Sequence, residues 1–178
     1  MTPRKGYTVK YAPQMATHQR SRVAILAGAK EVISAVGSYE SLMNDIAERS
    51  EVSRATIYNH FSDREELMHA LLASEVERLI AVGRTAGGKA EALYAISREI
   101  SEDLALAKMV ETDKDDVLAL TTITDHPVWI EIHRAGADIF GADENSVGLA
   151  LRWLIAQITS PLTAAQSKVQ SERLATLL

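Results

Sequence analysis

The chain has 178 residues, no cysteine and a formal net charge of −5 at pH 7. This length is enough for one domain or two small ones, and the lack of cysteine excludes disulfides and thiolate metal sites. No stretch approaches the ~18 apolar residues of a transmembrane helix and residues 1–19 lack the apolar run of a signal peptide, so we expect a cytoplasmic protein without a membrane partner.

The first part of the chain is predicted to start with a basic arm and then to form three helices. Residues 1–19 carry prolines and glycine without any period, and we expect a flexible arm there. A helical period of apolar residues runs from residue 20 to Gly37, which suits a helix C-cap. Ser41 is then predicted to cap a short second helix, and Ser53 a third one that ends near Phe61.

The remainder is predicted to be helical as well. A long helix starts at Asp63, or at Ser62 before it, and "GRTAGGK" (83–89) follows it as a loop. Further apolar periods predict one helix over 93–104, one after the acidic turn "ETDKDD", then "VWIEIHRAGADIF", "SVGLALRWLIAQI" and a last segment after Pro161. No segment has the pattern of a strand. The sequence therefore predicts an all-α fold of about nine helices.

Charge is distributed unevenly along the chain. Residues 1–64 hold nine Lys or Arg against six Asp or Glu, and the remainder holds ten against eighteen. A basic N-terminal part on an acidic body favours an anionic partner at the N-terminal part, although ordinary scatter in a small sample gives the same counts.

The third predicted helix has an unusual outward face. At about 100° per residue, Ile57 and Phe61 share one face that must pack inward. The opposite direction holds Asn59, flanked by Ala55 and Thr56, and longer polar side chains lie on the two margins. A solvated surface helix would explain the polarity but not the small centre. A helix in a DNA major groove explains both, because an amide can bond an adenine edge while the margins meet phosphates.

This stretch carries a family resemblance. "DIAERSEVSRATIYNHFSDREEL" (45–67) is similar to the signature of the TetR (tetracycline-repressor-like) family of bacterial transcriptional regulators, D-I-A, x-x-A-G-V-S, then x-x-T-[LIV]-Y-x-[HY]-F-x-x-[KR]-[ED]-x-L. "AILAGAKEVISAVG" (24–37) resembles the first helix of that family. The resemblance covers residues ~20–70. Ser50 and Glu51 stand where the family usually has Ala-Gly, so the turn must accept a left-handed residue or shift.

The resemblance implies a domain division and a set of DNA contacts. Residues 20–62 would form the helix-turn-helix domain, 63–178 an effector-binding and dimerisation domain, and the basic arm would reach a neighbouring minor groove. Of the predicted contacts, Asn59 and Arg54 would read bases. The whole predicted DNA-binding set is Ser41, Ser53, Arg54, Ala55, Thr56, Tyr58, Asn59, His60 and Arg64.

The acidic body is expected to hold a dimer interface. "SVGLALRWLIAQI" is apolar on nearly all sides, which predicts burial on both sides, either by a second copy or as the central helix of a monomer. The resemblance implies that the last two helices form a four-helix bundle with their mates. The predicted interface residues are Leu151, Leu154, Ile155, Ile158, Val169 and Leu174.

The resemblance also implies a pocket for a small, mostly apolar effector in the body. Aromatic residues with polar neighbours suit such a ligand, although each alone is more often a core residue. The candidates are Tyr94, Met109, His126, Trp129 and His133.

Other motifs carry no chemistry. "GRTAGGKA" lacks the final hydroxyl of a phosphate loop at Ala90, and the spacing of His126 and His133 is not that of a zinc helix. We therefore expect no enzyme activity, no cofactor and no metal.

The sequence predicts a DNA-binding transcriptional regulator, a repressor that is a homodimer on a palindromic operator in double-stranded DNA and is released by its effector. The alternative is a small-molecule-binding or interaction protein whose helix-turn-helix no longer binds DNA.

Overall fold

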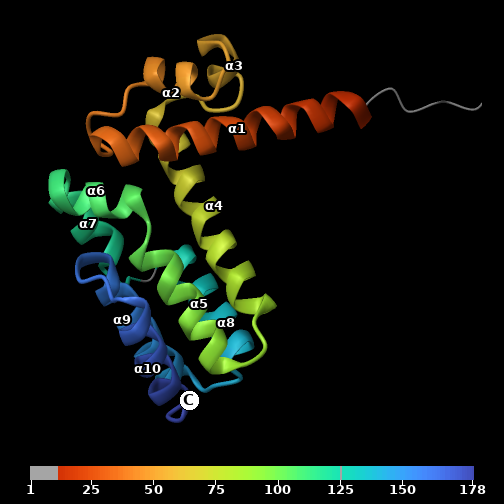
Figure 1. Cartoon of the computed structure of the whole chain (residues 1–178). Helices are drawn as coiled ribbons and strands as arrows, with labels where there is room; N and C mark the ends of the chain where they lie inside the picture. Colours follow the sequence, from red (N-terminus) through yellow and green to blue (C-terminus); the bar gives the residue numbers. More distant parts are fainter. Residues whose placement is uncertain (1–11, 125) are drawn as a thin grey trace, which may run out of the picture.

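The structure is a computed structural model that describes residues 12–124 and 126–178, and these residues form ten helices and no strand (Figure 1). The predicted all-α fold is therefore confirmed. The helices are α1 (Ala12–Val36), α2 (Met43–Arg49), α3 (Arg54–Tyr58), α4 (Arg64–Thr85), α5 (Lys89–Ser101), α6 (Leu104–Thr112), α7 (Lys114–Thr121), α8 (Pro127–Phe140), α9 (Glu144–Thr159) and α10 (Ala164–Ala175). Helix α1 crosses one end of the molecule beneath α2 and α3, and α4 leads from there into the body formed by α5–α10 (Figure 1).

Two segments differ from the sequence prediction. The helix expected over 93–104 is divided, because the Asp103 carboxylate accepts the backbone N–H groups of Ala105 and Leu106 at 2.9 and 3.0 Å and so caps a new helix, α6. This division gives the tenth helix. Helix α1 begins at Ala12, so residues 12–19 are helical and not part of a flexible arm. The basic residues predicted for the arm, Arg4, Lys5 and Lys10, lie outside the described residues.

The predicted helix ends are mostly correct. Gly37 has the left-handed φ of 90° expected after α1. Ser53 caps α3 by accepting the N–H of Thr56 at 3.0 Å, and Asp63 caps α4 by accepting that of Glu66 at 2.8 Å. Ser41 does not cap α2, contrary to the prediction. The N-cap residue of α2 is Leu42, and no side chain forms a capping hydrogen bond at this helix start.

The apolar side chains form two cores, one at each end of α4. Leu67 and Leu71 of α4 join the first core with side chains of α1–α3, while Leu79 and Val82 pack against the second core within the body. Ala105 of α6 also belongs to the first core, so the body contributes directly to the packing of the helix-turn-helix. The predicted domain boundary at residue 62 remains a prediction, because α4 serves both cores.

Ion pairs reinforce the joint between the two ends of the molecule. The Lys30 ammonium of α1 lies 2.7 Å from the Glu75 carboxylate of α4 and 2.6 Å from Asp103 at the start of α6. Arg78 bonds the same Glu75 at 2.9 Å. Partial burial of Lys30 acts to lower its pKa, but the bonds to Asp103 and Glu75 outweigh this and raise the pKa, so Lys30 is a cation at neutral pH.

The turn between α2 and α3 contains the departure from the family signature. Glu51 adopts φ 55°, and it is the one non-glycine residue with positive φ in the described part of the chain. The turn therefore keeps its left-handed residue without glycine. Gly28 of α1 fits closely beneath the turn, because a Cβ atom there would lie 2.8 Å from the Ser50 Cβ and 2.9 Å from the Ser50 backbone nitrogen. A side chain at position 28 would therefore displace the turn.

Across the described residues, no helix is both long and apolar enough to cross a membrane.

We expect Glu51→Gly to raise the free energy of unfolding by about 1 kcal/mol, because glycine relieves the strain of a left-handed residue at some cost in unfolded-chain entropy. Chemical denaturation measures it. Glu51→Ala is the matched control, since it removes the same carboxylate but keeps the Cβ atom, and it should give no such gain. Equal effects of the two variants would show that the turn stores no strain at Glu51.

Candidate nucleic-acid interface

Helix α3 presents a small exposed face next to a buried one. Ile57 is fully buried and Phe61, just beyond the helix, is 1% exposed, so these two side chains hold α3 in the first core as predicted. The exposed side chains of this segment are Arg54, Ala55, Tyr58 and Asn59. The helix is five residues long and Asn59 is its C-cap. The predicted base readers, Arg54 and Asn59, thus face solvent at opposite ends of one helix.

Two other residues predicted to contact DNA, Ser53 and Thr56, already form hydrogen bonds within the chain. The Ser53 hydroxyl caps the helix and lies 2.8 Å from the Thr56 hydroxyl, so these two side chains bond each other. Ser53 is nevertheless exposed and Thr56 is half-buried. The guanidinium carbon of Arg54 lies 6.0 Å from the centre of the Tyr58 ring, at the limit of a cation–π contact.

His60 lies at the contact between α3 and α1. Its ring centre is 4.0 Å from that of His18, and its Nδ1 atom is buried without a hydrogen-bond partner in the described residues. Burial, together with the nearby His18 and the positive charge of Arg22, lowers the pKa of His60. His60 is therefore neutral at neutral pH, and any phosphate contact it makes would be a neutral hydrogen bond.

Two residues predicted to contact phosphates have intramolecular hydrogen-bond partners in this structure. Ser41 is fully buried, and its hydroxyl donates to the Ser38 carbonyl oxygen at 2.7 Å, so DNA cannot reach it in this conformation. The Arg64 guanidinium donates to the carbonyl oxygens of Ser38 and Ser41, the latter at 3.2 Å. Arg64 thus ties α4 to the α1–α2 connection and has an intramolecular role.

Sequence reasoning missed the contact between the α1–α2 connection and α7, which we call the α7 clamp. The Asp113 carboxylate accepts the backbone N–H groups of Ser38 at 2.9 Å and Tyr39 at 3.1 Å, and Asp116 accepts the Ser38 hydroxyl at 2.5 Å. Partial burial acts to raise the pKa of Asp113, but hydrogen bonds from Thr112, Ser38 and Tyr39 outweigh it and lower the pKa. The acidic turn "ETDKDD" was the only signal for this contact.

The predicted effector residues do not gather around one cavity. Met109 packs against the first core, and His126 is an exposed N-cap whose Nδ1 accepts the N–H of Val128 at 3.3 Å. Tyr94 on α5 and Trp129 and His133 on α8 are half-buried. None of the five lines either of the two cavities described for the body, one between α7 and α9 and one between α4 and α8.

The predicted dimer residues divide between the core and the surface. Leu151, Leu154 and Leu174 are buried within the chain itself, so they are not available to a second copy. Ile158 packs against the second core and Ile155 is half-buried, whereas Val169 is 46% exposed. Helix α9 is not apolar on every side, since its outward side carries the charged and exposed Arg152 as well as the exposed Leu149.

Comparison with known proteins identifies the N-terminal part. Residues 25–71 match the model of the bacterial regulatory proteins of the tetR family. The N-terminal part of the chain is therefore similar to the N-terminal domain of tetR-family regulators. The HTH-type transcriptional regulator UidR of Escherichia coli K12 is 33% identical over 63 residues, which are 35% of this chain, and UidR of Shigella flexneri gives the same values. The match spans only 32% of the length of these curated relatives.

Solved structures of similar fold extend over most of the chain. The TetR family repressor AlkX from Dietzia sp. is 21% identical with a TM-score of 0.60, and the likeness covers 88% of this chain and 94% of AlkX. The fatty acid degradation regulator FadR from Bacillus halodurans is 16% identical with a TM-score of 0.55, over 88% of this chain and 93% of FadR. At these identities the comparison establishes the fold of the body and no more.

Substitution of two arginines should separate a DNA contact from an intramolecular one. Arg54→Ala should weaken DNA binding by about 1–3 kcal/mol and leave the unfolding free energy unchanged, because Arg54 is exposed. Arg64→Ala removes the same charge but should lower the unfolding free energy by about 1–3 kcal/mol, because backbone carbonyls lose their donor. Denaturant unfolding and fluorescence-anisotropy DNA titrations measure both. An Arg64→Ala protein of normal stability with a reduced salt dependence of DNA binding would restore the phosphate role.

Proposed function

We propose that this protein is a one-component transcriptional regulator that binds double-stranded DNA through α3. The observation that carries the proposal is the exposed face of α3, with Arg54, Ala55, Tyr58 and Asn59 on a helix held in place by Ile57 and Phe61. A slim helix with an amide and a guanidinium fits the major groove, where Asn bonds adenine and Arg bonds guanine in bidentate fashion. Of the predicted set, Ser53, Thr56 and His60 remain proposed backbone contacts. DNA binding places its action in the cytoplasm and requires no enzyme activity.

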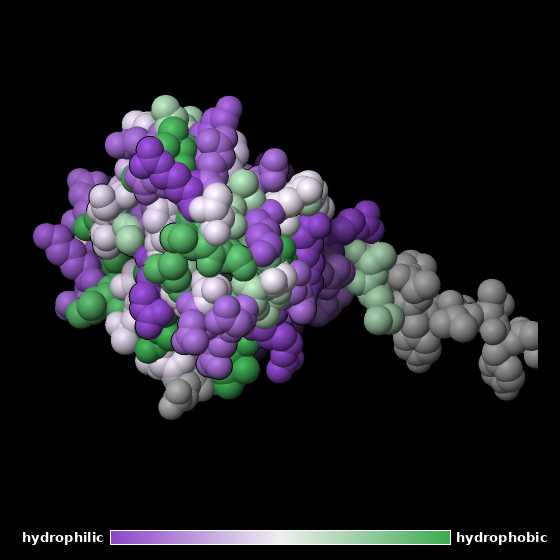
Figure 2. All heavy atoms as spheres, turned by 90° about the horizontal axis from the view of Figure 1, so that it is seen from below, coloured by the Kyte–Doolittle hydropathy of each residue, from purple (hydrophilic) through white to green (hydrophobic). Residues whose placement is uncertain are grey.

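The DNA-bound form is proposed to be a homodimer on a palindromic operator. One helix-turn-helix reads only a few base pairs, and two copies reach half-sites about one helical turn apart. The end of the molecule opposite α2 and α3 has a short apolar band among hydrophilic residues, which does not favour an interface there (Figure 2). The side formed by α9 and α10 suits a second copy better.

On that side, the edge of α9 towards α10 carries apolar residues. Trp153 of α9 is half-buried and donates its indole N–H to Gln170 of α10 at 2.8 Å. Leu149, one turn before Trp153, is 46% exposed, and so is Val169 beside Gln170. We propose these three side chains, Leu149, Trp153 and Val169, as the centre of the dimer interface in place of the buried leucines.

The regulator is proposed to be a repressor released by a small effector bound in the body. AlkX is named as a repressor implicated in biodegradation of n-alkanes, and FadR as a regulator of fatty acid degradation, so small, mostly apolar molecules are the effector class we favour. Release follows from linkage: the effector must bind the DNA-incompetent state more tightly, and DNA then weakens effector binding by the same factor.

The alternative of a protein that has lost DNA binding relied on Glu51 in the turn. Glu51 accepts the left-handed angle that the turn needs, and the base-facing side chains of α3 stay exposed. No observation on the described residues therefore favours the alternative.

Selection of bound sequences from random duplex DNA is the test of this function. We expect a palindromic sequence with half-sites about one helical turn apart. Asn59→Ala should relax the preference at one base position of each half-site and cost about 1–3 kcal/mol there. Ser62→Ala is the control, since Ser62 is exposed beyond α3 and its hydroxyl bonds Glu66, so it should keep the selected sequence. No enrichment by a folded protein would contradict the proposal.

Leu149→Asp should convert the dimer to monomer, because a charge would replace an apolar side chain at the centre of the proposed interface. Leu118→Asp on α7 is the control, because Leu118 is equally apolar, 65% exposed and outside α9 and α10. Sedimentation velocity measures the mass of each. A Leu149→Asp dimer as stable as the unsubstituted one would place the interface elsewhere.

A further inference from the structure

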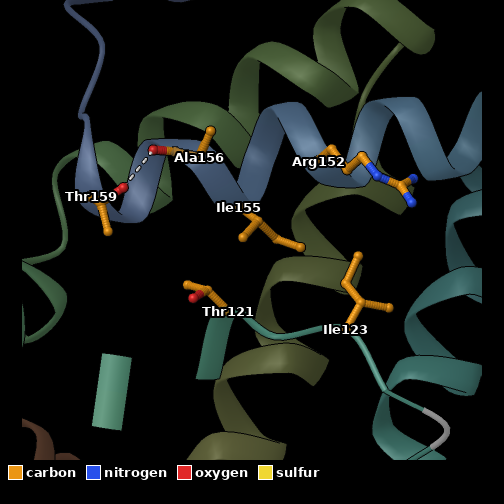
Figure 3. A pocket seen from close by; sticks show the side chains of 6 residues that line it. All are labelled: Thr121, Ile123, Arg152, Ile155, Ala156 and Thr159. Atoms are coloured by element: carbon orange, nitrogen blue, oxygen red, sulfur yellow. Dashed lines mark hydrogen bonds between the residues drawn. The ribbon is translucent and has the colours of Figure 1, made fainter. Parts of the chain in front are cut away.

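A cavity of about 460 Å³ lies between the outer side of α9 and the end of α7 (Figure 3). Ile155 and Ala156 of α9 and Ile123, beyond α7, give it an apolar lining. The polar lining groups are Thr121, Thr159 and Arg152. Volumes of this size hold small organic ligands. None of the three residues proposed for the centre of the dimer interface, Leu149, Trp153 and Val169, lines the cavity.

Most polar groups of this cavity are already engaged. The Thr159 hydroxyl donates to the Ala156 carbonyl oxygen at 3.3 Å, as drawn in Figure 3, and the Thr121 hydroxyl donates to that of Val117 at 2.9 Å. Arg152 is different. One of its Nη atoms donates to the Gly148 carbonyl oxygen at 3.0 Å, and no carboxylate among the described residues pairs with it. Its remaining N–H groups are free to bind an anion.

Arg152 has no ion-pair partner among the described residues, whereas Arg78 and Arg98 of the body each pair with an acid. The cavity at Arg152 has no acidic lining residue. A guanidinium at one side of a cavity that is partly lined by apolar side chains matches a molecule with one planar anionic group and an apolar remainder, since guanidinium binds carboxylate through two parallel hydrogen bonds.

We propose that the cavity between α7 and α9 binds an amphipathic carboxylate, with Arg152 holding the carboxylate and Ile123, Ile155 and Ala156 contacting its apolar part. That this carboxylate is the effector rests on the proposed function as a DNA-binding regulator. Binding of the carboxylate in the cavity does not depend on that function.

Helix α7 connects this cavity to the helix-turn-helix. Its C-terminal residue Thr121 lines the cavity, and at its other end Asp116 and the preceding Asp113 form the α7 clamp on Ser38 and Tyr39. The helix has eight residues, about 12 Å at 1.5 Å per residue. A ligand that moves Thr121 therefore moves the carboxylates that hold the connection between α1 and α2.

Isothermal titration calorimetry of the full chain with a homologous series of straight-chain carboxylates and the primary alcohols of equal length tests the site. We expect at least one carboxylate to bind about tenfold more tightly than its alcohol, the effect of one charge-assisted contact at a partly exposed site. Arg152→Gln should reduce the affinity for that carboxylate to that for the alcohol. Arg173→Gln, which removes an exposed charge of α10 away from the cavity, should leave it unchanged. Equal binding of acids and alcohols, no binding of either, or an unchanged Arg152→Gln protein would overturn the proposal.

The same ligand, titrated in the presence of the selected operator, tests the connection through α7. Saturating carboxylate should lower operator affinity of the unsubstituted protein, and Asp116→Asn should reduce that fold-change while carboxylate affinity in the absence of DNA stays the same. An unchanged fold-change in Asp116→Asn would overturn the role of the clamp. Operator binding without any carboxylate binding would overturn the site and leave the proposed function intact. Carboxylate binding without any selected operator would overturn the proposed function and leave the site intact.

Discussion

The burial of Ile57 and Phe61 is the constraint on which the DNA-facing surface depends. A five-residue helix has no stability of its own, since isolated helices need ~12–15 residues to be even marginal in water. Burial of each of these two side chains in the first core stabilises the folded protein by about 1.5–3 kcal/mol, and this burial holds the helix in place. Because these two residues fix the rotation of α3 about its axis, they also decide that Arg54 and Asn59 point outward. Recognition and folding thus use opposite faces of the same short segment.

The first core is not self-contained, and this gives the body influence over α3. Ala105 of α6 lies inside it, and Lys30 of α1 bonds both α4 and the start of α6. The α7 clamp adds a third attachment at the α1–α2 connection. The body therefore holds the helix-turn-helix through three kinds of contact: apolar packing, an ion-pair cluster and carboxylate–backbone hydrogen bonds. Any rearrangement of α6 or α7 must change at least one of these contacts.

The sequence predicts best what depends on local chemistry. Helix caps such as Ser53 and Asp63, the inward face of α3 and the left-handed residue in the turn could be predicted, because neighbouring residues determine them. The division at Asp103 was missed, because an apolar period alone does not show where one helix ends and the next begins. Ser41 and Arg64 have the right chemistry for phosphate, but tertiary packing gives their polar groups intramolecular partners. The cavity at Arg152 joins residues about thirty positions apart, and no pattern in the sequence connects them.

The close fit of Gly28 against Ser50 affects how genetic data on this protein should be interpreted. Position 28 lies on α1, away from the exposed face of α3, and any larger residue there would push the turn that leads into α3. Random mutagenesis that selects for loss of operator occupancy would therefore recover substitutions of Gly28 beside those of Arg54 and Asn59. Sorted by phenotype alone, they would be grouped with DNA-contacting residues. Sorted by operator preference, they would separate, since a displaced turn weakens every sequence while a lost base contact changes which sequence is preferred.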